Sequence, residues 1–580
     1  MFFFLENLQK LLFIVEKRLI HIFGIVIISI ISGSIDLIGF AIIIPFISII
    51  MEPNNIRIFE NNFILDYFNF SFETYNPLLI LSLLLILVFI SKAIIAIISK
   101  VVIVSFAYKK LANLQTKLMK KYHEMSYLDY LKNSKSYYIT SVRDLSKSCI
   151  DGLESSLKII SEILVMTLIF IYLAKLNYIA LLLLILIILP LAVTYNVIFK
   201  PLSISYGKKI AGSYEKIYQL IDESIYGFKE IKVNNKRNFF IKQLKDNANN
   251  VYTNTLKNFL ITVSPRYIFE VCIVFFVVFF IYLSLNHLET KNDIVPTIGV
   301  FAVACARLLP SISSILNDFT RINYSKFATD TCYNDIKNIQ NIDLTKRREI
   351  ENLSFKKIIF KNVSFRYPNS KTNILNKLNF EINQNDVIAI IGPSGSGKTT
   401  LIDLLLGLLN PTEGEISINE NSSKNENNLS TLSAYLPQDS LVIEDTIKKN
   451  ISLELDKDKI DLNLINKSLE EANLKTFVNT LPEGVETKIG EDSLRLSGGQ
   501  TQRLAIARNF YLKKEIIIMD EATSSLDEEN EDRIIDSLNN LKGKKTIILI
   551  THKFKLLKNF EKIFSLENGR LSKIRYENNK

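Results

Sequence analysis

Long apolar segments recur through the first 316 residues and dominate the hydrophobic pattern of the chain. There are six of them, at 19–50, 77–106, 159–173, 178–199, 259–283 and 294–316. A helix needs about 20 apolar residues to cross the hydrocarbon core of a membrane, which is about 30 Å thick. Five of the segments reach that length, and the third is shorter. The pattern predicts six membrane-spanning helices, which would place both ends of this region on the same side.

The polar loops between these segments differ in charge. Loops 108–150 and 201–260 hold nine and ten Lys or Arg, whereas loops 51–76 and 286–293 hold one each. Basic residues accumulate in cytoplasmic loops, so we expect both termini in the cytoplasm. Apolar residues at helical spacing in 214–232 predict that the spans continue into the cytoplasm, with a short turning helix joining each pair. In 51–76 we slightly favour a short interfacial helix over an ordinary loop.

The pattern changes near residue 354. From there, short β-branched runs alternate with helical stretches; the runs are KIIFKNVSF (357–365), DVIAIIG (386–392), EIIIMD (515–520) and KTIILIT (545–551). This alternation is typical of an α/β nucleotide-binding domain. We therefore expect an α-helical transmembrane domain at 1–330, a polar linker at 331–353 and an α/β domain at 354–580.

Composition supports a membrane protein. The 580 residues are 48% hydrophobic, and 69 Lys and Arg stand against 59 Asp and Glu. A basic balance can indicate nucleic-acid binding, but in so apolar a chain it favours positive cytoplasmic loops, and we predict no nucleic-acid partner. The four cysteines and four histidines form no metal-binding spacing, which favours free thiols in a reducing compartment. Residues 2–10 lack the basic start of a cleavable signal peptide.

The segment GPSGSGKT (392–399) matches the phosphate-binding pattern G-x-x-x-x-G-K-[ST]. It follows an apolar strand and precedes a helix, which is the context that this loop requires. Its glycines let backbone N–H groups surround phosphates at the positive end of the helix. Lys398 would reach the β- and γ-phosphates, and Thr399 would bind Mg²⁺. A chance glycine-rich turn is disfavoured by this context, so ATP and Mg²⁺ are the predicted cofactors.

A second motif, EIIIMDEATSSLD (515–527), is an apolar strand that ends in two acids. Asp520 is placed to join the Mg²⁺ shell, and Glu521 to orient or deprotonate the attacking water. Alone, such a pair could be only the N-cap of a helix. Together with the phosphate-binding loop, it indicates ATP hydrolysis.

A third motif, LSGGQTQRLAIAR (496–508), places a serine and two glycines at the start of a helix. This is a second helix end that can bind an anion. Two such ends in one chain suggest an ATP site that is built from two copies of the protein.

These motifs and the six spans together resemble the ABC transporters of the exporter type, over the whole chain. The resemblance implies an ATPase coupled to transmembrane transport, working as a homodimer with two equivalent ATP sites. It implies that Glu521, His552 and Gln438 are catalytic and that Gln438 also senses Mg²⁺. A solvent-facing loop histidine is the alternative for His552. It further implies ATP contacts through Tyr367, Gly392, Ser394, Gly395, Gly397, Lys398, Thr399, Thr400, Ser497, Gly499, Gln500 and Asp527.

Three cations lie inside the predicted spans. Arg307 and Lys92 lie about 20 and 22 Å from the outer ends of two inward-running spans, and Arg266 lies about 10 Å above the inner face in an outward-running one. Each has a structural explanation: Arg266 can pair with Glu270, one turn later, and Lys92 can extend to the interface. Because each costs about 2.5–3.5 kcal/mol to insert, three at one level favour a shared cavity for an anion.

Three segments carry a closer resemblance: SIDLIGFAIIIPFI (34–47), SPRYIFE (264–270) and ARLLPSISSI (306–315). They are similar to the bacterial PglK-type flippases, which move undecaprenyl-pyrophosphate-linked oligosaccharide across the inner membrane. The resemblance implies that Arg266, Arg307 and Lys92 bind the pyrophosphate, with Lys92 standing where those proteins have arginine.

The leading hypothesis is therefore ATP-driven flipping of a lipid-linked oligosaccharide to the outer leaflet of a bacterial inner membrane. One alternative is an exporter of another amphiphile, such as lipid A or drugs, which would share every ATP motif. Another is a soluble ABC-type ATPase that acts on nucleic acid or ribosomes. The six spans and their loop charges disfavour the soluble ATPase.

Overall fold

The structure is a computed structural model that describes residues 2–14, 19–51, 77–287, 291–338, 355–368, 370–419, 421–422, 428–490, 493–521, 541–552, 557 and 560–574. The chain divides into two compact units. One comprises residues 1–125 and 129–341, and the other comprises residues 126–128 and 342–580.

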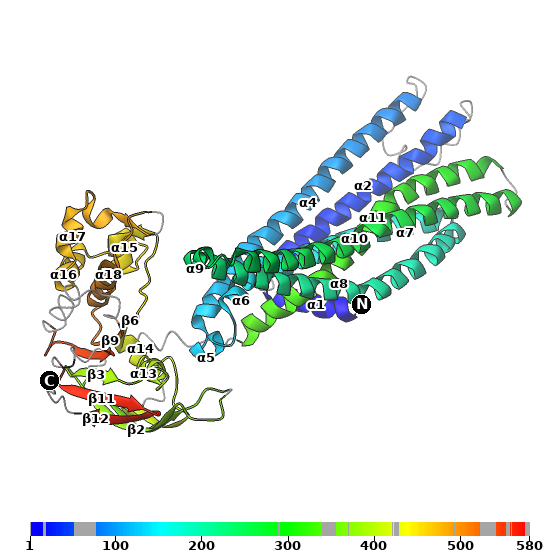
Figure 1. The fold of residues 1–580 in the computed structure, drawn as a ribbon. Helices are drawn as coiled ribbons and strands as arrows, with labels where there is room; N and C mark the ends of the chain where they lie inside the picture. The colour runs from blue at the N-terminus through cyan, green and yellow to red at the C-terminus, as the bar shows by residue number, and fades with distance from the viewer. Residues whose placement is uncertain are drawn as a thin grey trace. The chain divides into compact units, whose positions relative to one another are not determined.

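The first unit is a bundle of long helices that run side by side (Figure 1). Short helices lie between some of the long ones. In chain order the helices are α1 (Phe2–Ile14), α2 (Leu19–Met51), α4 (Pro77–Glu124), α5 (Tyr127–Tyr130), α6 (Lys135–Thr140), α7 (Ser146–Leu176), α8 (Tyr178–Tyr226), α9 (Phe228–Val233), α10 (Arg237–His287) and α11 (Lys291–Asn338). A π-helical turn, Ser141–Leu145, joins α6 to α7.

Five helices of the described chain are long and apolar enough to cross a membrane. They contain the first five predicted spans, and the sixth falls within α11. The third span is not short, because α7 is a continuous helix of 31 residues. The 49 residues of α8 extend for about 73 Å, more than twice the hydrocarbon thickness. The helices therefore continue well beyond any membrane, as the loop pattern predicted.

Short helices stand where the sequence predicted turning helices. The helices α5 and α6 lie between α4 and α7, and α9 lies between α8 and α10. At the far end of the bundle, α11 continues to Asn338, so it includes the first part of the predicted linker 331–353. The predicted interfacial helix in 51–76 falls outside the described residues, apart from Met51 at the end of α2.

Glycines allow α11 to pack closely against two other helices. A Cβ added at Gly207 of α8 would lie 2.1 Å from the carbonyl oxygen of Tyr324 in α11. One added at Gly152 of α7 would lie 2.3 Å from Oγ of Ser325. Because a methyl group cannot fit at such distances, these glycines set how near the helix axes come.

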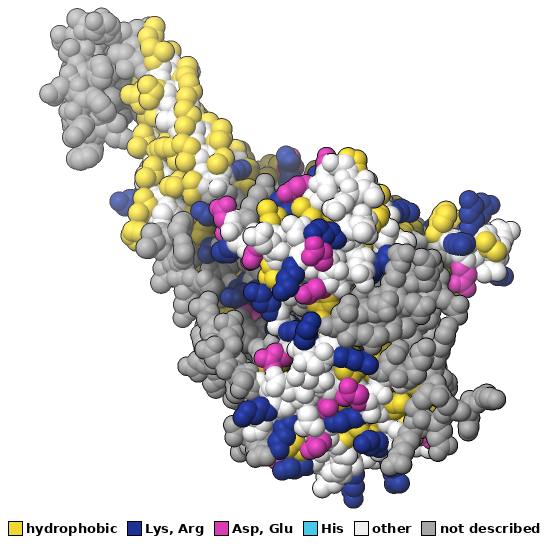
Figure 2. All heavy atoms as spheres, turned by 90° about the vertical axis from the view of Figure 1, so that its left-hand side faces the viewer, with side chains coloured by type: hydrophobic (Ala, Val, Ile, Leu, Met, Phe, Trp, Pro, Cys, Tyr) yellow, Lys and Arg dark blue, Asp and Glu magenta, His cyan; other side chains and the backbone are white. Residues whose placement is uncertain are grey.

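The outward faces of the long helices are apolar. Figure 2 shows hydrophobic side chains along the visible part of these helices. Leu87 of α4, Leu186 of α8 and Val271 of α10 are at least two-thirds exposed. Exposed apolar surface of this extent marks a surface that meets lipid or another protein. With the lengths of the helices, it supports a membrane location.

The second unit contains two main β-sheets and short helices. Its strands are β1 (Lys357–Phe365), β2 (Leu375–Asn383), β3 (Val387–Ile391), β4 (Glu413–Ile418), β5 (Asn421–Ser422), β6 (Ser433–Leu436), β7 (Asp445–Thr446), β8 (Lys488–Ile489), β9 (Ile516–Asp520), β10 (Thr546–Ile550), β11 (Lys562–Glu567) and β12 (Arg570–Ile574). Its α-helices are α13 (Lys398–Leu405), α14 (Asn428–Leu432), α15 (Ile447–Ser452), α16 (Leu462–Glu471), α17 (Lys475–Thr480) and α18 (Gly498–Tyr511).

The larger sheet has the order β12-β11-β3-β10-β9-β6. Its strands from β11 to β6 are parallel, and β12 is antiparallel at one edge. The central strands β3, β9 and β10 are nearly unbroken runs of buried aliphatic residues, as expected for strands covered on both faces. Because they are parallel, their carboxyl ends meet at one edge of the sheet, where ligands bind in such folds.

Two hydrophobic cores hold this unit together. The first joins α13 to the four-stranded sheet β2-β1-β4-β5 and to one face of the larger sheet. The second joins the other face of the larger sheet to α15, α16, α17 and α18. The phosphate-binding loop and the LSGGQ helix are therefore anchored in different cores.

Candidate functional site

The phosphate-binding loop connects β3 to α13 at the carboxyl edge of the larger sheet. Gly395 and Gly397 have φ of +79° and +104°, which side-chain-bearing residues rarely adopt. A Cβ at Gly392 would lie 2.4 Å from the carbonyl oxygen of Leu566. The loop thus needs glycine at these three positions, whereas Ser394 and Thr399 lie exposed on it.

Lys398 folds back over this loop. Its Nζ donates to the carbonyl oxygens of Gly392 and Pro393, at 2.9 and 3.0 Å. The Lys398 side chain is buried against the loop. An anion bound by the loop's N–H groups would therefore also lie near the charge of Lys398. This placement fits the role in phosphate binding that the motif predicted.

Three predicted residues stand at adjacent strand ends. Asp520 ends β9, Glu521 follows it, and His552 comes two residues after β10. The Nε2 of His552 lies 2.7 Å from Oε1 of Glu521. Glu521 has φ of +48°, and its N–H donates to the carbonyl oxygen of Ile550 in the neighbouring strand. This unusual backbone conformation turns the Glu521 carboxylate towards His552, a pairing that can orient a general base.

Asp520 has neighbours that the sequence did not single out. The hydroxyl of Tyr435, on the neighbouring strand β6, donates to Asp520 at 3.3 Å. Burial raises the pKa of Asp520 above its usual range, and the nearby Glu521 adds to that rise. Asp403 of α13 is buried close by, and burial together with Asp520 raises its pKa to about 6. An acid on a helix face gave no sequence signal, because its proximity to Asp520 depends on how α13 packs on the sheet.

The residues at this edge fit a magnesium nucleotide. Within the described chain, no group of three or more His, Cys, Asp or Glu is arranged to hold a metal. Mg²⁺ in nucleotide sites usually takes one or two protein ligands and completes its shell with phosphate oxygens and water. The exposed Thr399 hydroxyl and the Asp520 carboxylate supply that number. When bound, the ion would neutralise charge on the phosphate oxygens.

The LSGGQ residues begin α18. The Oγ of Ser497 accepts from the N–H of Gln500 at 3.3 Å, and the Ser497 N–H donates to Oε1 of Gln500 at 2.8 Å. This capping box fixes the N-terminus of the helix, where Gly499 is buried. The helix packs against α15, α16 and β6, rather than joining the core that holds α13.

The remaining predicted ATP contacts are described in part. Tyr367 packs edge-on against Phe365, and its hydroxyl lies 3.5 Å from Oγ1 of Thr400 in α13, so it stands beside the phosphate-binding loop. Gln438 follows β6 at the same edge of the sheet. Asp527 lies outside the described residues.

The three predicted substrate cations line one cavity in the helical unit. The cavity measures about 850 Å³ and lies among α2, α4, α7, α10 and α11. Lys92 comes from α4, Arg266 from α10 and Arg307 from α11. Their positions along the predicted spans place these three cations at a similar level in the membrane. The structure places all three on the wall of one cavity.

Two of these cations share a buried carboxylate. Asp36 of α2 has a side chain that is 0% exposed; it lies 2.6 Å from Nζ of Lys92 and 3.0 Å from Nε of Arg307. Arg307 also donates to Oγ of Ser311 at 2.8 Å, and that hydroxyl donates to Glu162 at 2.8 Å. We call these five residues the Asp36 cluster.

The acids of the Asp36 cluster were not among the predicted site residues. Asp36 is the lone acid in the apolar segment 19–50, which is a signal that the sequence did carry, because an ionisable residue within a span marks a functional or paired position. Lys92 does not extend to an interface but points to Asp36. The described structure has no ion pair between Arg266 and Glu270, and Arg266 is exposed on the cavity wall.

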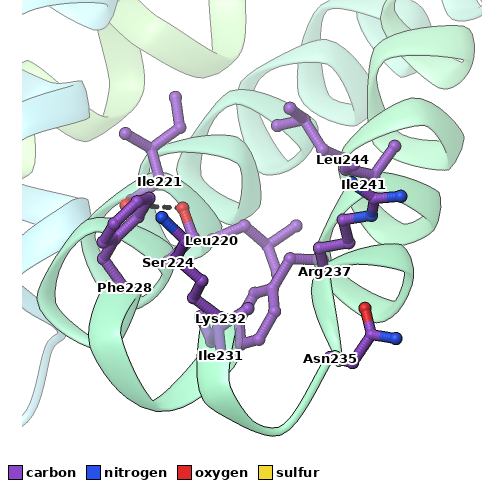
Figure 3. Close-up of a pocket in the computed structure, with 11 residues that line it drawn as sticks. Leu220, Ile221, Ser224, Phe228, Ile231, Lys232, Asn235, Arg237, Ile241 and Leu244 are labelled. Atoms are coloured by element: carbon purple, nitrogen blue, oxygen red, sulfur yellow. Dashed lines mark hydrogen bonds between the residues drawn. The ribbon is translucent and has the colours of Figure 1, made fainter.

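A second hollow, of about 420 Å³, lies where α9 joins α8 and α10 (Figure 3). Its lining is mostly apolar and includes Ile221, Phe228 and Leu244. None of the predicted ATP or substrate residues lines it. It belongs to the turning helix that was expected to link the spans to the nucleotide-binding domain.

Two protein-family profiles match the chain. Residues 22–308 match the profile described as ABC transporter transmembrane region. Residues 375–524 match the profile described as ABC transporter. Together they cover most of the helical unit and the α/β unit, in the order that the sequence predicted.

Individual relatives agree with these profiles. The ATP-dependent lipid A-core flippase of Bordetella avium (strain 197N) is 34% identical over 281 residues, which is 47% of each chain. That of Saccharophagus degradans is 31% identical over 368 residues, 63% of this chain and 61% of the relative. The chain thus spans between 36% and 61% of the length of the lipid A-core flippases that it matches.

A solved structure supports the fold over nearly the full chain. A bacterial Atm1-family ABC exporter with ATP bound superposes with a TM-score of 0.77 at 19% identity. The match covers 95% of this chain and 94% of the other. At that identity, the likeness establishes the fold: helices of an ABC exporter fused to an ABC ATPase domain.

Proposed function

Because the chain belongs to the ABC transporters, as an exporter-type half-transporter, we propose that it is an ATP-driven flippase of a polyprenyl-pyrophosphate-linked oligosaccharide. The cargo would move from the cytoplasmic to the outer leaflet of a bacterial inner membrane. The observation that carries this proposal is the cavity in the helical unit, whose wall brings together Lys92, Arg266 and Arg307. A cavity of about 850 Å³ with this charge suits a pyrophosphate head group better than an uncharged drug.

ATP would act through two copies of the chain. The LSGGQ helix and the phosphate-binding loop are anchored in separate cores of one chain, which supports a site completed by the partner's LSGGQ helix. Glu521, held at 2.7 Å from His552, would activate the water that attacks the γ-phosphate. The turning helices α5, α6 and α9 would pass closure of the ATPase domains to the spans.

A second candidate function is flipping of lipid A or its core-bearing form. It is favoured by the relatives, which are lipid A-core flippases at 34% and 31% identity. Lipid A carries phosphates too, so the basic cavity by itself does not separate the two cargoes. The glycan and the polyprenyl tail distinguish them.

The test is the lipid dependence of the ATPase in proteoliposomes that contain the purified dimer. We expect undecaprenyl-pyrophosphate-linked oligosaccharide to stimulate ATP hydrolysis and to be flipped. Stimulation by lipid A-core alone would replace the first proposal with the second, and stimulation by uncharged drugs alone would refute both. The variant Glu521→Gln controls for contaminating ATPases.

A variant in the cavity adds a test of the site. Arg307→Ala removes one cation from the Asp36 cluster and leaves Asp36 paired with Lys92 alone. We expect flipping to fall sharply while ATP hydrolysis without lipid persists. Arg307→Lys should retain only part of the flipping, because it keeps the charge but cannot contact Asp36 and Ser311 at once as the guanidinium does. Normal flipping by Arg307→Ala would exclude Arg307 from the substrate site.

A further inference from the structure

The basic side chains of the cavity are not equivalent. Six of them line it: Lys92, Lys100, Lys158, Arg266, Arg307 and Arg321. Three have carboxylate partners. Lys92 and Arg307 share Asp36, and Lys158 lies 2.5 Å from Glu154, four residues earlier in α7.

The Asp36 cluster is electrically neutral as a group. Its two cations, Lys92 and Arg307, are balanced by the carboxylates of Asp36 and Glu162, and Ser311 bridges Arg307 to Glu162. A charge buried at such a depth is tolerated because it is paired, so Asp36 holds its two partners firmly. An incoming anion would have to compete with these carboxylates before it could bind Lys92 or Arg307.

The other three cations, Lys100, Arg266 and Arg321, are exposed. Across the described residues, none of them has a carboxylate oxygen within 4.0 Å. A ligand could therefore approach these three cations without displacing a carboxylate from direct contact. Arg321 interacts at longer range with Asp151 and with Asp318, which also lines the cavity.

Two of these three exposed cations, Lys100 and Arg321, also lie nearer to the predicted loading side. Lys100 follows Lys92 by eight residues in α4, which is about 12 Å along the helix. Arg321 follows Arg307 by 14 residues in α11, about 21 Å. Both spans are predicted to run inwards, so Lys100 and Arg321 would be closer to the cytoplasm than the Asp36 cluster.

We propose that Lys100, Arg266 and Arg321 receive the anionic group of the cargo first, while Asp36 keeps Lys92 and Arg307 in a neutral cluster. Asp36 is then a positioning residue that limits how tightly the cavity holds an anion. The inference rests on the proposed function in taking the cargo to carry a pyrophosphate.

The experiment measures equilibrium binding of radiolabelled farnesyl pyrophosphate to the nucleotide-free dimer in lipid nanodiscs. Lys100→Gln and Arg321→Gln should each raise Kd about two- to fivefold, the effect expected for losing one exposed charge contact. Asp36→Asn removes the carboxylate that holds Lys92 and Arg307 and should lower Kd, because both cations then become available to the anion. Lys10→Gln is the control, because Lys10 pairs with Asp330 and is absent from the cavity wall.

The outcomes separate the inference from the proposed function. Unchanged Kd in Lys100→Gln and Arg321→Gln overturns the inference, and so does an Asp36→Asn variant that binds no more tightly than the wild type. The two variants of exposed residues, Lys100→Gln and Arg321→Gln, decide the matter if Asp36→Asn fails to fold. A wild type that ignores farnesyl pyrophosphate but is stimulated by the lipid-linked oligosaccharide overturns only the inference. The predicted binding pattern without such stimulation overturns only the proposed cargo.

Discussion

At the scale of single residues, function depends on side chains that tertiary neighbours hold in position. Glu521 follows a buried strand in a left-handed backbone conformation, and the neighbouring strand places His552 at 2.7 Å from it. Asp36 is held by two cations from helices far apart in the sequence. In both cases the type of residue indicates which role is possible, and the neighbouring side chain determines how the carboxylate is held.

Replacing Glu521, the proposed general base, should stop hydrolysis but not nucleotide binding. Glu521→Gln removes the carboxylate that would accept the proton from water, so we expect ATP turnover to fall about 100-fold or more. ATP binding should persist, because Lys398 and the phosphate-binding loop are unchanged. Phosphate release and nucleotide binding by the purified protein check this. Turnover near the wild-type rate would assign the base to another residue.

Asp403 predicts a pH dependence of stability. Its pKa rises from 3.8 to about 6 on folding, so the folded protein keeps the proton to a higher pH than the unfolded chain does. Stability therefore falls as the pH rises from about 4 to 6 and stays lower above it, by up to about 3 kcal/mol. Asp403→Asn should raise the melting temperature more at pH 7.5 than at pH 4.5. An equal effect at both pH values would contradict this.

At the scale of elements, close helix packing sets the shape of the bundle. The pair α8 and α11 approaches at Gly207, where no Cβ fits. Helix α8 also carries Gly212, where an added Cβ would have no atom within 4 Å. The two glycines therefore have different reasons to be glycine.

This contrast gives a matched pair of variants. Gly207→Ala should destabilise the protein by about 1–3 kcal/mol, because the added methyl group forces α8 away from the Tyr324 carbonyl. Gly212→Ala should be neutral or stabilising by up to about 1 kcal/mol, because alanine favours the helix. Thermal unfolding of the purified protein in detergent compares them. Equal melting temperatures for the two variants would show that α8 and α11 pack less closely than described.

At the scale of the whole molecule, the ATP site is expected to need two copies of the chain. Each chain has one phosphate-binding loop and one LSGGQ helix, held in different cores. A homodimer would pair the loop of each copy with the helix of the other.

Mixing two inactive variants tests this arrangement. Lys398→Ala inactivates the phosphate-binding loop, and Ser497→Arg inactivates the LSGGQ helix, so each homodimer should lack ATPase activity. A mixed dimer has one site with both parts intact, because the intact loop of one copy meets the intact helix of the other. Co-expression should therefore restore part of the activity. A mixed dimer as inactive as its parents would place each site within a single chain.

Much of the molecule could be predicted from sequence, and particular residues show why. Lys398 and Glu521 lie in short motifs whose strand and helix context is itself visible in the hydrophobic pattern. The spans follow from apolar length, because a membrane imposes a minimum on it. Asp403 was missed because it gains its role from a neighbour more than 50 residues away in the chain. Asp36 could have been noticed as the lone acid of an apolar segment, but its partners Lys92 and Arg307 could not, because they come from distant helices.

The sequence by itself determined the two kinds of domain, the number of predicted spans and the ATP motifs, since these depend on local composition and spacing. Only the tertiary structure decided which cations of the cavity are paired. Charge is a property of the residue, but its availability to a ligand depends on what packs beside it. Lys92 and Arg307 form ion pairs with Asp36, and Arg266 forms none with a described carboxylate, because of how α2, α4, α10 and α11 cross.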